Sequence, residues 1–269
     1  QIKEQVDQLT QEMRRKEEVT WQQQQQAESV AESHEEVKKK LEEVSKQLDE
    51  MIRQAKKHKL FSDETMQKYQ ELQQMFQELM TPELEEALKK LQEAMDQLDP
   101  KQVREAMEEL QQQEQDFAES IDRALELFKR VKIEQQMDEV VRRIDELVKQ
   151  QEQISNRADS AGTDPRELGQ EQQQAADEYD IAEKRMEELA NLMEEFPVMP
   201  SQRMRQAIEQ AQMDSIARKM RNAQQSFQQG EMQSGKQMSE QSKQNLQELS
   251  KQLQQTQQQM QQNTMNEIM

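Results

Sequence analysis

Apolar residues recur over the first 59 positions at alternating steps of three and four, the spacing of helices that pack along a narrow seam. One row of this seam comprises Val6, Met13, Thr20, Ala27, His34, Leu41, Leu48 and Ala55, and the other comprises Ile2, Leu9, Lys16, Gln23, Val30, Val37, Val44 and Met51. The pattern predicts one long helix over residues 1–59. The polar run at residues 22–26 predicts looser packing or a local bend near its middle.

Three further helix starts are marked by a capping residue that stands directly before a proline. They are Thr81-Pro82, Asp99-Pro100 and Asp164-Pro165. Thr and Asp side chains accept hydrogen bonds from the free N–H groups at a helix start, and proline is favoured at the first helical position. We therefore predict that a new helix begins at each of these prolines. A shorter helix can begin at Ser62 or Asp63.

These signals divide the chain into five predicted segments. They are a long helix of a shaft at 1–59, a two-helix hairpin head at 60–99, a long return helix at 100–160, a shorter helix and proline turn at 161–200, and a C-terminal helix with a low-complexity Gln-rich tail at 201–269. The tail either frays or becomes ordered only by packing on the rest. The predicted fold class is all-α: an elongated antiparallel coiled coil or helical bundle with a helical-hairpin head.

Two irregularities mark the seam of the return helix. Glu114 is its one charged position, and the phase of the seam slips by about one residue between Val131 and Met137. Such a slip changes how helices wind around one another. The slip therefore indicates a local adjustment of the supercoil winding.

The composition agrees with a seam better than with a globular core. Hydrophobic residues make up 32% of the chain, against roughly 45–50% in ordinary globular domains, and charged residues make up 34%. The net charge of −19 disfavours binding to nucleic acid and to anionic membranes. No apolar run approaches the ~20 residues of a membrane span, so we expect no direct membrane insertion by this segment. Because the sequence begins with Gln1, we expect a fragment or a processed product, with a possible anchor outside it.

The sequence predicts no enzyme, and we expect no catalytic residue, cofactor or metal. It has no cysteine, no Gly-rich phosphate loop and no nucleophile-elbow serine. His34 falls on the seam, where a polar residue that sets the helix register is favoured over a metal ligand, because the Glu-x-x-His pair of di-iron bundles is absent. His58 lies in a basic cluster that suits the solvated end of a helix.

Aromatic residues gather in the predicted head, where Phe61, Tyr69 and Phe76 lie within sixteen positions. They form either the small core of the hairpin or a recognition tip, and they are the candidate partner-binding residues. Trp21 either packs on a neighbouring helix or serves as an exposed anchor, and packing is favoured. The methionines on the seam fill a helical core or adapt to varied partners.

A more specific set of sequence segments lies within residues 71–150. It consists of Phe76-Gln-Glu-Leu-Met-Thr-Pro-Glu-Leu84, Leu91-Gln-Glu-Ala-Met-Asp-Gln-Leu-Asp-Pro100 and Arg123-Ala-Leu-Glu-Leu-Phe-Lys-Arg130. These segments resemble the long Gln/Glu-rich helical region of large bacterial transmembrane envelope proteins that are catalogued only as a domain of unknown function. The resemblance implies a periplasmic helical part of an anchored protein, and it implies no activity.

The resulting hypothesis is a non-catalytic structural or partner-binding coiled-coil scaffold, the extracytoplasmic part of a bacterial envelope protein. Its partner would be another protein or a second copy, bound through helical seams. The alternatives are a lipid-associating amphipathic helical protein, which should gain helicity on added vesicles, and a hydrophilic, largely disordered protective protein, which should lack a strong helix signal in circular dichroism. A cytoplasmic location is the alternative to the envelope.

Overall fold

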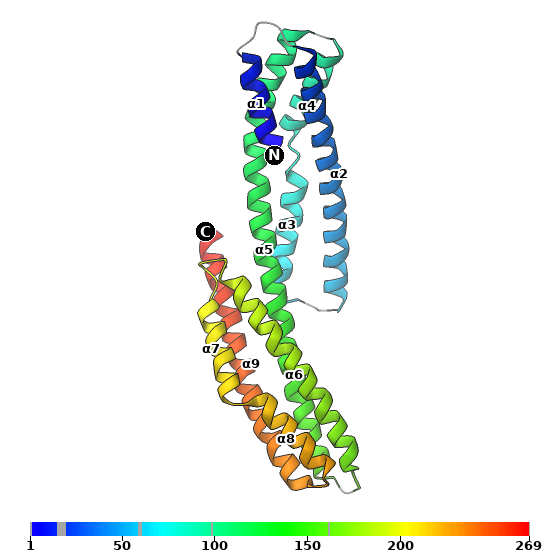
Figure 1. Ribbon diagram of the computed structural model, residues 1–269, viewed down its shortest axis with the longest axis vertical. Helices are drawn as coiled ribbons and strands as arrows, with labels where there is room; N and C mark the ends of the chain where they lie inside the picture. Colours follow the sequence, from blue (N-terminus) through cyan, green and yellow to red (C-terminus); the bar gives the residue numbers. More distant parts are fainter. Residues whose placement is uncertain (1, 15–19, 59–60, 98, 161, 269) are drawn as a thin grey trace. The chain divides into compact units, whose positions relative to one another are not determined.

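The computed structural model describes residues 2–14, 20–58, 61–97, 99–160 and 162–268, and within these ranges it is built of helices without strands (Figure 1). The helices are α1 Ile2–Arg14, α2 Trp21–His58, α3 Asp63–Glu78, α4 Pro82–Asp96, α5 Pro100–Ala158, α6 Pro165–Met193, α7 Ser201–Met213, α8 Ile216–Gln228 and α9 Met232–Ile268. The predicted all-α fold class is confirmed.

The helices form two compact units that share α5. The first unit comprises residues 1–59 and 63–131, and the second comprises residues 60–62 and 132–269. The boundary after Val131 coincides with the predicted slip in the seam, which began at the same residue. The slip therefore marks the point where the apolar side chains of α5 pass from one core to the other.

The predicted single helix over residues 1–59 is wrong, because α1 ends at Arg14 and α2 begins at Trp21 and packs beside it. The start of α2 is a reciprocal cap: Thr20 Oγ1 accepts from the N–H of Gln23 at 3.3 Å, and Gln23 Oε1 accepts from the N–H of Thr20 at 2.9 Å. This cap stops α2 from extending further toward the N-terminus. Lys16, a seam position of the prediction, lies outside the described residues.

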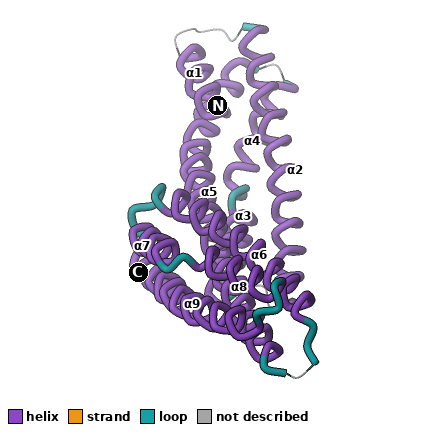
Figure 2. Tube along the Cα trace, turned by 60° about the horizontal axis from the view of Figure 1, so that its bottom comes forward, coloured by secondary structure: helices purple, strands orange, loops and turns teal. Residues whose placement is uncertain are grey.

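The predicted hairpin head at 60–99 is also wrong. Helices α3 and α4 follow one another along α2, and both pack on it (Figures 1 and 2). The turn between them restarts the helix without reversing the chain, since Thr81 Oγ1 caps the N–H of Leu84 at 3.1 Å. Leu79 before the turn and Leu84 after it are both buried in the same core, so the apolar face continues across the turn.

The core of the first unit lies between α1, α2, α4 and the first half of α5. Its buried apolar residues are Val6, Leu9, Met13, Ala27, Val30, Leu79, Leu84, Ala87, Leu91, Ala94, Val103, Ala106, Met107, Leu110 and Phe117. These residues recur on each helix at the spacing that the seam predicts. The range predicted for the return helix, 100–160, corresponds to α5.

The second unit packs α7 and α8 against both α6 and α9. The predicted single helix over 201–269 is wrong, because the helix is interrupted twice. The interruptions lie at Ser215, which has a φ of 54°, and at Gly230, which has a φ of 80°. Both residues adopt the left-handed conformation that ends a helix. The Gln-rich segment is helical as α9 and packs on the rest through Leu246, Leu249, Leu253 and Met260.

The three predicted cap-proline starts are found at α4, α5 and α6. Asp99 Oδ1 accepts from the N–H of Lys101 at 2.9 Å, and Asp164 Oδ1 accepts from the N–H of Arg166 at 2.8 Å. The predicted proline turn lies between the end of α6 and the start of α7.

Candidate functional site

The core of the first unit encloses a histidine and a glutamate that face each other. His34 of α2 is fully buried, and its Nε2 lies 2.9 Å from Oε2 of Glu114 on α5, whose side chain is 4% exposed. Neither imidazole nitrogen nor Oε2 has a hydrogen-bond partner with suitable alignment. The contact is therefore a close approach of two ionisable groups that lacks the alignment of a hydrogen bond.

Phe117 ties this His34–Glu114 pair to the apolar core. Its ring centroid lies 5.6 Å from that of His34, and the ring planes are tilted by 50°. Phe117 stands one turn after Glu114 on α5 and belongs to the core of the first unit. The sequence predicted His34 and Glu114 as separate polar seam positions, and the structure brings them together.

A hollow on the surface between α2 and α4 reaches His34. Its wall includes His34 and the apolar side chains of Met80 and Leu88, and it is rimmed by charged residues of both helices. Lys38 Nζ of α2 and Glu85 Oε1 of α4 form an ion pair at 2.6 Å across it. This contact, followed by the coulombic field of Glu85, raises the pKa of Lys38.

The second unit pairs uncharged polar side chains across helices, and it also buries the carboxylates Glu134 and Asp138. Gln172 of α6 accepts a hydrogen bond from Ser239 Oγ of α9 at 2.9 Å, and both residues are fully buried. Gln151 of α5 is also fully buried, and its amide has no hydrogen-bond partner. A buried polar group costs free energy unless it is hydrogen-bonded. The bond between Gln172 and Ser239 therefore favours the arrangement of α6 and α9 that allows it.

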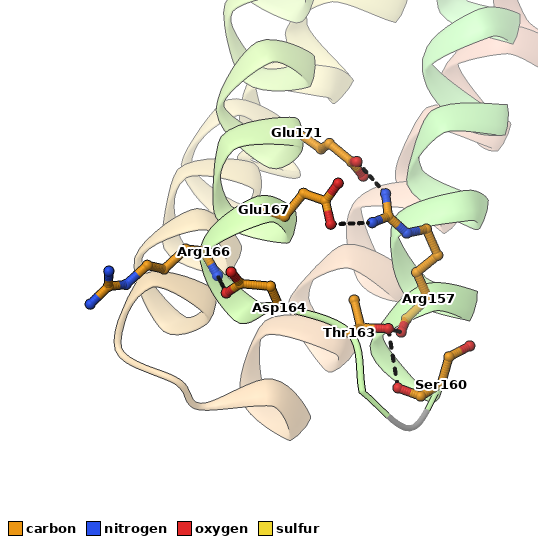
Figure 3. A network of polar contacts seen from close by, with 7 residues as sticks. All are labelled: Arg157, Ser160, Thr163, Asp164, Arg166, Glu167 and Glu171. Carbon is orange, nitrogen blue, oxygen red and sulfur yellow. Dashed lines mark hydrogen bonds and ion pairs between the residues drawn. The ribbon is translucent and has the colours of Figure 1, made fainter.

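Ion pairs hold the turn between α5 and α6 (Figure 3). The guanidinium of Arg157 at the end of α5 reaches Glu167 at 2.9 Å and also Glu171, both on α6. Thr163 Oγ1 donates to the backbone carbonyls of Arg157 at 2.8 Å and Ser160 at 3.1 Å. The guanidinium of Arg157 is paired with both glutamates, so these contacts close the turn. The side chain of Arg166 points away from them (Figure 3).

Tyr179 of α6 is the largest buried polar side chain of the second unit, and its hydroxyl has no hydrogen-bond partner. Burial, followed by the nearby charges of Glu183, Asp180 and Asp214, raises its pKa. Partial burial also raises the pKa of Glu183, while a hydrogen bond from Gln212 opposes that shift. The phenol therefore stays neutral at physiological pH and acts as a core side chain.

The candidate partner-binding residues do not form one exposed cluster. Tyr69 is 2% exposed and Phe76 is partly buried against the core of the first unit, whereas Phe61 belongs to the second unit. A recognition tip made of these three residues is therefore not present. Trp21, for which packing was favoured, is 72% exposed at the start of α2, so that expectation is wrong.

Within the described residues, no group of three or more His, Cys, Asp or Glu side chains is placed to hold a metal ion. The helices within the same ranges lack the continuous apolar stretch that a membrane-spanning helix requires. His58 is exposed at the end of α2, and the buried methionines Met13, Met107 and Met137 fill helical cores.

The fold and its buried groups define an all-α helical-bundle protein whose polar core residues face one another between helices. Comparison of the chain with family models, with curated proteins and with solved structures found no match.

Proposed function

We propose that the chain is a non-catalytic helical scaffold that binds another protein or a second copy, and that it is the extracytoplasmic part of a bacterial envelope protein. The main support is the use of its buried polar groups. His34 faces Glu114 and Gln172 bonds Ser239, each across two helices, so these groups organise the core. The envelope location rests on the resemblance of residues 71–150.

A scaffold acts through its folded shape, and an enzyme depends on particular reactive side chains. We therefore propose a complementation test in a strain that lacks this chain. Replacement of the carboxylates that rim the hollow, as Glu32→Gln, Glu35→Gln and Glu85→Gln, should leave complementation intact. The core variant Phe227→Ala should abolish it, because Phe227 is fully buried. Loss of function in a carboxylate variant whose circular dichroism is unchanged would contradict a scaffold.

The location is tested separately with a cysteine, because the chain has none of its own. Gln25 is exposed on α2, so Gln25→Cys should present a thiol to solvent without disturbing the core. A bulky maleimide that cannot cross the inner membrane should label this cysteine in cells whose outer membrane has been permeabilised. Labelling only after lysis of the inner membrane would place the chain in the cytoplasm.

A further inference from the structure

A methionine on the surface of the second unit carries an inference beyond a scaffold role. Among the methionines whose side chains the structure describes, Met213 alone is exposed, and 65% of it is accessible to solvent. We propose that Met213 is a site of oxidative modification, at which hydroperoxides convert the thioether to a sulfoxide. The buried methionines are spared. They are Met13, Met107, Met137, Met186, Met193, Met199, Met204, Met220 and Met260.

The exposure of Met213 follows from the apolar stripe of α7. The buried residues of this helix recur at steps of three and four, and they are Met204, Ala207, Ile208 and Ala211. Met213 stands two positions after Ala211, which turns its side chain about 200° around the helix axis. The last residue of α7 therefore points away from the core that covers Met204.

The reaction requires only that an oxidant reaches the sulfur atom. A lone pair of the sulfur attacks one oxygen of hydrogen peroxide, and an S–O bond forms as the O–O bond breaks. The departing hydroxide takes the proton of the transferred oxygen and leaves as water. The sulfur is oxidised by two electrons and the peroxide is reduced by two, so the product is the sulfoxide. A sulfur buried between packed helices does not admit the peroxide, because such interiors hold few voids larger than a water molecule.

The same reaction has different consequences on the surface and in the core. The sulfoxide is polar, whereas the thioether is apolar. At Met204, which is fully buried, it would place a polar group among apolar side chains, and such burial is costly. At Met213 the new oxygen stays in water. Oxidation of Met213 therefore leaves the fold intact, and the intact fold continues to protect the buried methionines.

Timed oxidation of the whole folded chain by hydrogen peroxide tests the proposal. Samples are quenched, digested with trypsin and analysed by mass spectrometry. The tryptic peptide 206–218 contains Met213 as its single methionine, and the peptide 186–203 contains the buried Met186, Met193 and Met199. Because access of the peroxide sets the rate, we expect sulfoxide to form about tenfold faster in 206–218 than, per methionine, in 186–203. Circular dichroism should stay unchanged while 206–218 is being oxidised.

A matched variant separates exposure from local sequence. Met213→Leu/Ile208→Met moves the methionine of the same peptide to a buried position of α7, since Ile208 is 7% exposed. Its oxidation should become as slow as that of 186–203. In urea that unfolds the chain, the wild-type peptides should be oxidised equally fast per methionine. Equal rates in the folded wild type, or a change in circular dichroism that accompanies oxidation of Met213, would overturn the proposal.

Discussion

The first unit buries a histidine and a glutamate that face each other across two helices at 2.9 Å. The second unit instead joins Gln172 and Ser239 across two helices by a hydrogen bond at 2.9 Å, and it also buries the carboxylates Glu134 and Asp138. Apolar packing is similar in the two units. Leu41, Phe76 and Ile121 are partly buried against the first core, and Val148, Leu192 and Met238 are partly buried against the second. The two units therefore differ in how their buried polar side chains are partnered across helices.

The largest expected effect is a loss of packing in the second unit. Phe227 of α8 is fully buried. Phe227→Ala should destabilise this unit by about 3–5 kcal/mol, since it leaves a large cavity. Hydrogen exchange should show the loss in α6, α8 and α9. The matched change in the first unit is Leu91→Ala, with an expected cost of about 2–5 kcal/mol, and equal losses in both units from either variant would remove the distinction between them.

The second-largest expected loss of stability comes from the close packing of α8 on α9. A Cβ atom at Gly235 would lie 2.6 Å from the ring of Phe227, whereas a Cβ at Gly169 would meet Gln228 Cγ at 2.9 Å, in a flexible side chain. Gly235→Ala should therefore destabilise the second unit by about 1–3 kcal/mol despite its better helix propensity. Gly169→Ala is the comparison, and urea unfolding should show a smaller loss of stability than for Gly235→Ala. A neutral Gly235→Ala would mean that the two helices can move apart at little cost.

Removal of the buried Tyr179 hydroxyl should stabilise the second unit. Since that group has no hydrogen-bond partner, Tyr179→Phe should add about 1 kcal/mol at pH 7. The raised pKa of Tyr179 adds a pH dependence. Above about pH 10 the unfolded chain releases the phenolic proton that the folded chain retains, so wild-type stability falls as the pH rises.

Thermal unfolding between pH 7 and pH 11 measures both effects. The curve for Tyr179→Phe should start higher than that of the wild type and fall less steeply above pH 10. Tyr69→Phe, at the buried tyrosine of the first unit, shows whether the gain belongs to the second unit. A Tyr179→Phe protein that is less stable at pH 7 would reveal a partner for the hydroxyl.

A smaller gain in the stability of the second unit is expected from a substitution at Ser215, between α7 and α8. Ser215 adopts a φ of 54°, a conformation that costs a side-chain-bearing residue roughly 1–2 kcal/mol. Ser215→Gly should relieve part of this strain and raise the stability of the second unit by about 0.5–1 kcal/mol. Ser215→Ala keeps the Cβ atom and should give no such gain in the same urea titration.

Local signals in the sequence predicted much of this fold. The cap-proline pairs located the starts of α4, α5 and α6. The slip near Val131 lies at the boundary between the units, but we related it only to helix winding and did not predict a boundary there. These features depend on a few neighbouring residues, so one sequence is enough to identify them. The cap formed by Thr20 and Gln23 is also a local feature, but we did not identify it because Gln23 lies within a run of glutamines.

Features that depend on distant residues could not be predicted. Ser215 breaks a helix without a glycine or proline to mark the position. The pairing of His34 with Glu114 depends on the relative register of two helices 80 positions apart in the chain, which the seam alone does not determine. The predicted hairpin failed for the same reason, because Thr81-Pro82 marks the start of a helix and says nothing of the direction it takes.

The account depends most on α5 as one helix shared by two separate cores. Hydrogen exchange along α5 in Phe227→Ala tests this directly, because the variant weakens only the second core. We expect protection to fall in peptides after Lys132 and to remain at the wild-type level in peptides before Val131. Equal loss of protection along the whole of α5 would contradict the division into two units.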